Sequence, residues 1–308
     1  MCESLIRWSR LMPSNIKQLV ISLCFIGLLS SCVNLQSVQD FGTASKTFGT
    51  SYDEVYYGAY NTCIASRELN HIKSQVAHLE NFNPENQSSE DEKFCESWKE
   101  FGGIYKETAL ALADFGSALD ALATKGNMDF KPQFTEITEN LSEITENLSI
   151  SPTFELQKEN VDKVNFLAQI LLRSYIKNQA AMLIRDSEKE VLAALELLKV
   201  LSDIYEEQLN TYRRNINDVS KLIIVSETEK SLVLQFLVRD NLNKYKKRKE
   251  LLENYATSLD KVGNSYSELL QRAKLPKPHF DDPVFQKKMQ DFLINIIKLV
   301  QESKIINN

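Results

Sequence analysis

Apolar side chains recur at alternating intervals of three and four residues along much of the chain. The first stripe runs from Val38 to Leu69 and slips by one position at Ile72. A second stripe keeps its spacing without a slip from Phe94 to Leu122. Spacing that averages 3.5 residues keeps one side of a helix facing a neighbouring helix. The pattern therefore predicts an all-α fold, an elongated antiparallel helical bundle with coiled-coil-like heptad stripes.

The second half of the chain also has the pattern of helices, interrupted by short polar clusters. No proline occurs between Pro152 and Pro276, so we place the breaks at the polar clusters 185–187 and 225–228. The expected helices span roughly 153–184, 187–223 and 227–274. Because a single domain cannot bury so many residues in one rod, we expect these helices to fold back into the same bundle.

A proline-rich linker and a last helix are predicted within 275–308. Asp281-Asp282-Pro283 has the composition of a helix start, because aspartate caps the first amide groups and proline fits the first turn. The apolar face of this helix carries Phe285, Met289, Phe292, Ile296 and Leu299.

A duplicated heptad, EITENLS, occupies 136–142 and 143–149. Two copies are too few for a solenoid, so we interpret this part as a short coiled-coil arm. The chain then divides into a hairpin over 32–126, the heptad arm and connection over 127–152, long helices over 153–274, and the linker with its helix over 275–308.

Composition supports long helices with few turns, since 308 residues contain only nine glycines and seven prolines. The formal net charge is −6. An acidic chain of this kind lacks the positive field that nucleic-acid binding requires, so we expect no nucleic-acid partner.

The N-terminal stretch 19–32, LVISLCFIGLLSSC, is a short apolar run that follows several basic residues. A membrane-spanning helix needs about 20 apolar residues, and this run is shorter. A basic lead-in, a short apolar core and small residues at its end are typical of a cleaved export signal. The signal has the same layout whether translation starts at Met1 or at Met12.

The sequence Leu29-Ser30-Ser31-Cys32 at the end of this run resembles the lipobox of bacterial lipoproteins. The resemblance covers the first 32 residues and implies that 1–31 are removed and that Cys32 is acylated. Membrane lipid would then be the first partner, and the protein would be anchored in the cell envelope. Val33, not aspartate, follows the cysteine, which in many bacteria with two membranes goes with delivery to the outer membrane. We expect the protein to face the periplasm there, with exposure at the cell surface as the alternative.

Export also separates the five cysteines. Cys2 and Cys24 would leave with the signal and Cys32 would carry lipid, so Cys63 and Cys95 remain as a pair in a compartment that permits disulfides. We expect a disulfide between them; the alternative is two unpaired thiols packed as small apolar groups. The two cysteines face each other only if the hairpin turns near residue 79. We therefore expect the first helix to end near the slip at 69–72.

Candidate chemistry is sparse. His71 and His78 are about 10 Å apart along a helix, too far to share one metal without a further ligand. His279 lies beside Asp281 and Asp282, whose commoner role is to cap a helix. No phosphate-binding loop, Cys-x-x-Cys, His-Glu-x-x-His or Gly-x-Ser-x-Gly motif occurs. We assign no catalytic residue, metal or cofactor; enzymatic activity stays open without support from particular residues.

One run of positive charge is a possible surface for an anionic partner. It consists of Lys244, Lys246, Lys247, Arg248 and Lys249. Most such runs are solvated helix faces. The functional interpretation is contact with anionic lipid, an acidic cell-wall polymer or an acidic protein, which salt would weaken.

These observations favour a membrane-anchored, non-enzymatic scaffold or adaptor with a periplasmic or other envelope protein as its partner. Two alternatives stay open. One is an envelope-defence or membrane-active protein of the exclusion or immunity type, whose helices rearrange. The other is a solute-binding or enzymatic bundle, which a pocket of converging polar groups would support.

Overall fold

The computed structural model describes residues 35–75, 84–125, 163, 180–225 and 228–307. Within these ranges the chain forms helices and no strand, which confirms the predicted all-α bundle. The helices are α3 (Gln36–Thr50), α4 (Asp53–Tyr56), α5 (Gly58–Gln75), α6 (Pro84–Phe94), α7 (Glu96–Lys125), α10 (Ala180–Asp186), α11 (Glu188–Val225), α12 (Thr228–Ala273) and α13 (Pro283–Asn307). The predicted signal 1–31, Cys32 and the heptad arm 127–152 lie outside the described residues.

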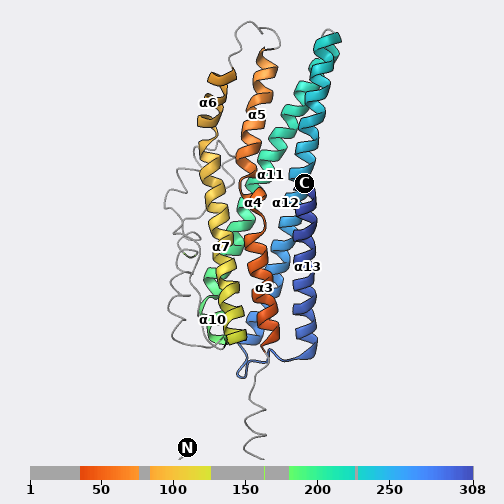
Figure 1. Ribbon diagram of the computed structural model, residues 1–308. Coiled ribbons are helices and arrows are strands. Elements are labelled where there is room, and N and C mark those ends of the chain that lie inside the picture. The colour runs from red at the N-terminus through yellow and green to blue at the C-terminus, as the bar shows by residue number, and fades with distance from the viewer. Residues whose placement is uncertain (1–34, 76–83, 126–162, 164–179, 226–227, 308) are drawn as a thin grey trace, which may run out of the picture.

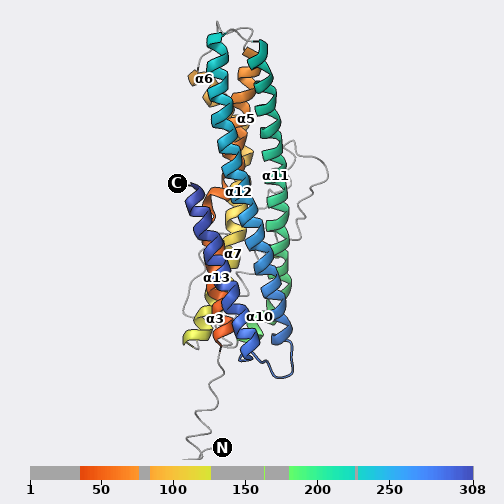
Figure 2. The ribbon, with the colours of Figure 1, turned by 90° about the vertical axis from the view of Figure 1, so that its right-hand side faces the viewer.

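The helices run along one long axis and define two ends of the bundle (Figures 1 and 2). We call the end where α3 begins and α12 ends the base, and the end where α5 ends and α12 begins the tip. The chain rises through α3, α4 and α5, descends through α6 and α7, rises through α11 and descends through α12. The last helix, α13, rises from the base and ends part-way up the bundle.

The first predicted stripe does not belong to one straight helix, because the chain breaks between α3 and α5. Helix α3 ends at Thr50, and the single turn α4 precedes α5. The Tyr56 hydroxyl donates a hydrogen bond to Gly49 O at 3.1 Å, which occupies a carbonyl near the end of α3. The stripe spacing hid the break because Tyr52 and Val55, which lie within it, are both buried.

Helices α3 and α7 pack closely because glycines stand at their crossing. A Cβ atom on Gly42 would lie 2.5 Å from Gly116 O, and a Cβ atom on Gly116 would lie 2.5 Å from Gly42 O. Around this crossing the core is aromatic: the Phe41 ring contacts the rings of Phe115 and Phe292 at centroid distances of 6.5 and 5.9 Å. Close contact of α3 with both α7 and α13 thus builds the half of the bundle nearer the base.

Helix α5 ends and α6 begins at positions that suit the cysteine pair. The midpoint between Gln75, which ends α5, and Pro84, which begins α6, is close to residue 79. The predicted end of the first helix at 69–72 is wrong, because α5 continues to Gln75. Only 76–83 are then left for the connection, so the longer helix still brings Cys63 opposite Cys95.

The expected helix 153–184 lies mostly outside the described residues, whereas the boundaries of the next two helices agree with the prediction to within a few residues. Helix α11 covers 188–225 and α12 covers 228–273. Asp282 Oδ1 accepts a hydrogen bond from Phe285 N at 2.9 Å, which is the predicted cap of α13. That bond lowers the pKa of the Asp282 carboxyl. In the part of the chain that the structure describes, no helix combines the length and apolar character needed to cross a membrane.

Candidate functional site

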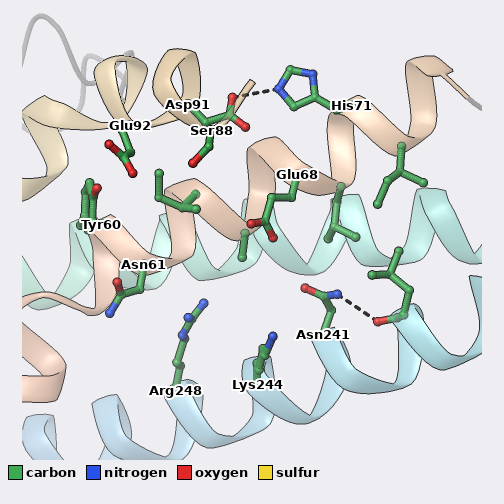
Figure 3. Close-up of a pocket in the computed structure, with 15 residues that line it drawn as sticks. Tyr60, Asn61, Glu68, His71, Ser88, Asp91, Glu92, Asn241, Lys244 and Arg248 are labelled. Carbon is green, nitrogen blue, oxygen red and sulfur yellow. Dashed lines mark hydrogen bonds and ion pairs between the residues drawn. The ribbon is translucent and has the colours of Figure 1, made fainter. Parts of the chain in front are cut away.

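A groove of about 640 Å³ lies between α5 and α12 in the half of the bundle nearer the tip (Figure 3). Helices α5 and α12 both pack on α11, which runs behind the groove. Helix α5 contributes Tyr60, Asn61, Ile64, Ala65, Glu68, Leu69, His71 and Ile72; α6 contributes Ser88, Asp91 and Glu92; α12 contributes Leu237, Asn241, Lys244 and Arg248. Apolar side chains therefore share the groove with charges of both signs.

A small apolar cluster joins the helices behind the groove. Its buried members are Ala65, Leu69, Tyr212, Ile216, Val219 and Leu234. The Tyr212 hydroxyl donates a hydrogen bond to Asn241 Oδ1 at 2.6 Å, and Asn241 Nδ2 donates to Leu237 O at 2.9 Å. Burial raises the pKa of Tyr212 to about 12, so its phenol stays protonated near neutral pH and can keep this bond. The amide of Asn241 is thereby held at the edge of the groove.

Asp91 and the disulfide hold α6 against α5 along the groove. The Asp91 carboxylate, whose side chain is only 5% exposed, accepts hydrogen bonds from Arg67 Nε at 2.9 Å and His71 Nε2 at 2.8 Å. Cys63 and Cys95 are joined by a disulfide, with their Cα atoms 5.9 Å apart. This is the pair expected from the sequence. A covalent bond and a buried carboxylate that accepts two hydrogen bonds thus fix this wall of the groove.

Two residues of the basic run, Lys244 and Arg248, point from α12 into the groove (Figure 3). Lys244 Nζ lies 2.8 Å from Asp240 Oδ2, one turn earlier on the same helix. Arg248 Nη1 donates to Thr62 Oγ1 at 3.3 Å, and its guanidinium lies 5.7 Å from the centre of the Tyr212 ring. Arg248 therefore spans from α12 to both neighbouring helices, which fixes the position of its charge.

The other three residues of the basic run do not line the groove. Lys249 forms an ion pair with Glu206 of α11 and lies 3.5 Å from Glu253. Lys246 and Lys247 are exposed to solvent. Consecutive residues of a helix point about 100° apart, so a run in the sequence spreads around the helix. The five predicted cations do not form one continuous patch.

The opposite wall of the groove is acidic. Glu68 and Glu92 are exposed, and Glu68 points from α5 toward the α12 side (Figure 3). Sequence reasoning missed both, since carboxylates are abundant and neither belongs to a motif. The sequence holds one indication near this wall, the change in the spacing of the apolar stripe at Ile72, and Ile72 lines the groove.

The three histidines do not come together. His71 pairs with Asp91 and His78 lies outside the described residues. The exposed imidazole of His279 has Nδ1 3.9 Å from Asp281 Oδ1. Across the described ranges, no three His, Cys, Asp or Glu side chains gather as metal ligands would. The groove combines apolar contacts with cationic and anionic side chains, which is an arrangement suited to binding.

Comparison with known proteins gives no relative: no family model, curated protein or solved structure matches this chain. Functional interpretation therefore rests on the residues of the groove and on its place in the bundle.

Proposed function

We propose that the protein is a lipid-anchored, non-enzymatic scaffold or adaptor of the cell envelope that offers the groove between α5 and α12 to a protein partner. The observation that carries the proposal is the position of this groove, in the half of the bundle away from the start of α3. An anchor at the base and a binding surface toward the tip are the two parts that a tethered adaptor needs.

The anchor belongs at the base because Cys32 precedes Gln36, the first residue of α3, by four positions. Each buried CH₂ of an acyl chain contributes about 0.8 kcal/mol, and two chains hold a protein stably on a membrane. The diacylglyceryl group that the lipobox implies supplies two such chains.

The groove is far from this anchor along the bundle axis. From Ala273 at the base, α12 rises about 38 Å to Arg248 and about 54 Å to Leu237, at 1.5 Å per residue. Charges in solution interact weakly beyond about 8–10 Å at physiological salt. This distance favours a protein over the lipid headgroups around the anchor as the partner of Lys244 and Arg248.

Crosslinking of the intact lipidated protein in its own envelope tests this function. We expect one protein partner in stoichiometric amount. Recovery of lipid or glycan alone would contradict the proposal. A Cys32→Ser variant should leave the membrane fraction for the soluble fraction; unchanged membrane association would show that the anchor is assigned wrongly.

Solute binding is the second candidate, and the groove itself favours it. Small-molecule sites commonly enclose about 300–1,000 Å³ and combine apolar walls with a few polar groups. The groove has this volume, with Glu68 on one wall and Arg248 on the other. Native mass spectrometry of the protein purified from its envelope distinguishes the two: a solute-binding protein should carry a bound small molecule, which Arg248→Gln should remove.

A further inference from the structure

Helix α13 covers only part of the length of the bundle. It packs between α3 and α12 from the base upward and ends well short of the tip (Figures 1 and 2). Its inner face buries Phe285, Met289, Phe292, Ile296 and Val300. These are the residues of the predicted apolar stripe with one difference: in the last turns Val300 is buried, whereas the predicted Leu299 is only half-buried.

The end of α13 can be placed against α12. Tyr52 OH lies 2.9 Å from Ser258 Oγ, and Ser303 of α13 interacts with the same phenol. Four residues of α13 follow Ser303, or about 6 Å of helix, whereas Arg248 stands about 15 Å above Ser258 on α12. The groove therefore begins about 9 Å beyond the end of α13.

The groove lies beyond the end of α13, toward the tip. On one side α12 runs uninterrupted past both, and on the other side α5 follows α3 toward the tip (Figure 1). Along the upper part of α12, apolar side chains are exposed: Val233 is 70% and Phe236 is 77% exposed. Neither residue lines the groove itself. Val233, Asp240 and Lys247 precede Glu268 by whole heptads, and Glu268 pairs with Lys288 of α13, so Val233 lies on the α12 face toward α13 and Phe236 lies beside it.

We propose that this groove seats an amphipathic helix of the partner protein, lying end to end with α13 and carrying acidic residues against α12. The inference rests on the proposed adaptor function and names its partner's chemistry. From Val233 to Arg248 the seat is about 22 Å long, which accommodates a helix of about 15 residues. The apolar stripe of that helix packs on Ile64, Ile72 and the exposed Phe236.

Charge decides the orientation of the seated helix. On the α12 side Lys247 is exposed and Arg248 is fixed in the groove, while Lys244 forms an ion pair with Asp240. The α5 and α6 side carries Glu68 and Glu92. A helix with glutamates on the flank facing α12 meets cations there and avoids repulsion from the acidic wall.

A display experiment tests the inference. The probe is a library of 15-residue helices with a fixed leucine stripe and either Glu or Lys at each flanking position, selected on the purified full chain. We expect Glu to be enriched at least tenfold on one flank. The Lys244→Glu/Lys247→Glu variant should reverse that preference. A matched variant at the base, Lys189→Glu/Lys287→Glu, changes the net charge equally and should leave the preference as it is.

Three outcomes overturn the inference: no enrichment, an enrichment that Lys244→Glu/Lys247→Glu leaves unchanged, or binding that survives Val233→Ser/Phe236→Ser. Circular dichroism checks that each variant is folded. A concentration-dependent dimer that the Ser variant abolishes, without selection of acidic helices, would make a second copy the occupant. If crosslinking finds a partner while the library shows no preference, the adaptor function stands and this inference fails.

Discussion

Replacement of Gly116 by alanine is expected to destabilise the bundle, although alanine favours helix. Its Cβ atom would lie 2.5 Å from Gly42 O, 2.9 Å from Lys46 N and 2.9 Å from Ser45 Cβ, whereas ordinary contacts of a Cβ atom are 3.4–4 Å. Two of these three atoms belong to the backbone of α3 and cannot rotate away. Helix α3 would have to move by about 1 Å, together with the aromatic rings packed on it.

The magnitude follows from two opposing effects. Overpacking of a close-packed core costs about 1–3 kcal/mol, and rigid backbone atoms place this site near the upper limit. Alanine in place of glycine stabilises the helix by about 1 kcal/mol. We therefore expect Gly116→Ala to lower the free energy of unfolding by about 2 kcal/mol.

Gly103 on the same helix is the matched control, since nothing lies within 4 Å of the position a Cβ would take there. Gly103→Ala should raise the free energy of unfolding by about 0.5–1 kcal/mol. Urea denaturation followed by far-ultraviolet circular dichroism compares both variants with the wild type. If Gly116→Ala proves as stable as Gly103→Ala, the close packing of α3 on α7 is refuted.

Three further predictions concern the groove wall and the buried phenols. Cys63→Ser should lower the free energy of unfolding by about 3–4 kcal/mol in chemical denaturation, because the disulfide closes a loop of 32 residues; thiols that react with an alkylating agent before reduction would argue against the bond. Asp91→Asn should cost about 1–3 kcal/mol in thermal or urea unfolding, since Asp91 is buried with two partners. The exposed neighbour provides the comparison, and Glu92→Gln should change stability by less than about 0.5 kcal/mol. Burial raises the pKa of Tyr205 to about 12 from its usual value near 10. The folded state thus holds the phenolic proton more tightly, so about 3 kcal/mol of stability is present below pH ~10 and is lost as the pH rises through about 12. Circular dichroism during an alkaline titration should show unfolding in that window, and a protein equally stable at both ends would contradict it.

Much of the fold can be predicted from the sequence, because buried helix faces give the apolar residues a regular spacing and polar clusters interrupt that spacing. The boundaries of α11 and α12 follow from the polar clusters at 185–187 and 225–228. The break between α3 and α5 is not legible, because Tyr52 and Val55 keep the spacing of the stripe. What ends α3 is a tertiary arrangement that includes the bond from Tyr56 to Gly49 O.

The candidate site is legible only in part. Cys63 and Cys95 are predicted as a pair by elimination, from the expectation that the other three cysteines belong to an export signal and a lipobox. The groove depends on where α13 stops along α12 and on which helices flank it, and a pattern of apolar positions does not specify neighbours. The basic run also suggests one continuous charged surface that the helix does not form, since Arg248 points into the groove while Lys249 points to α11.

Lipid anchoring at the base is the central claim, because the separation between membrane and groove follows from it. Mass spectrometry of the N-terminal peptide, taken from protein purified out of its native envelope, tests it most directly. The account predicts a mature chain that begins at Cys32 and carries the added mass of a diacylglyceryl group. A chain that still contains residues 1–31, or an unmodified Cys32, would contradict it.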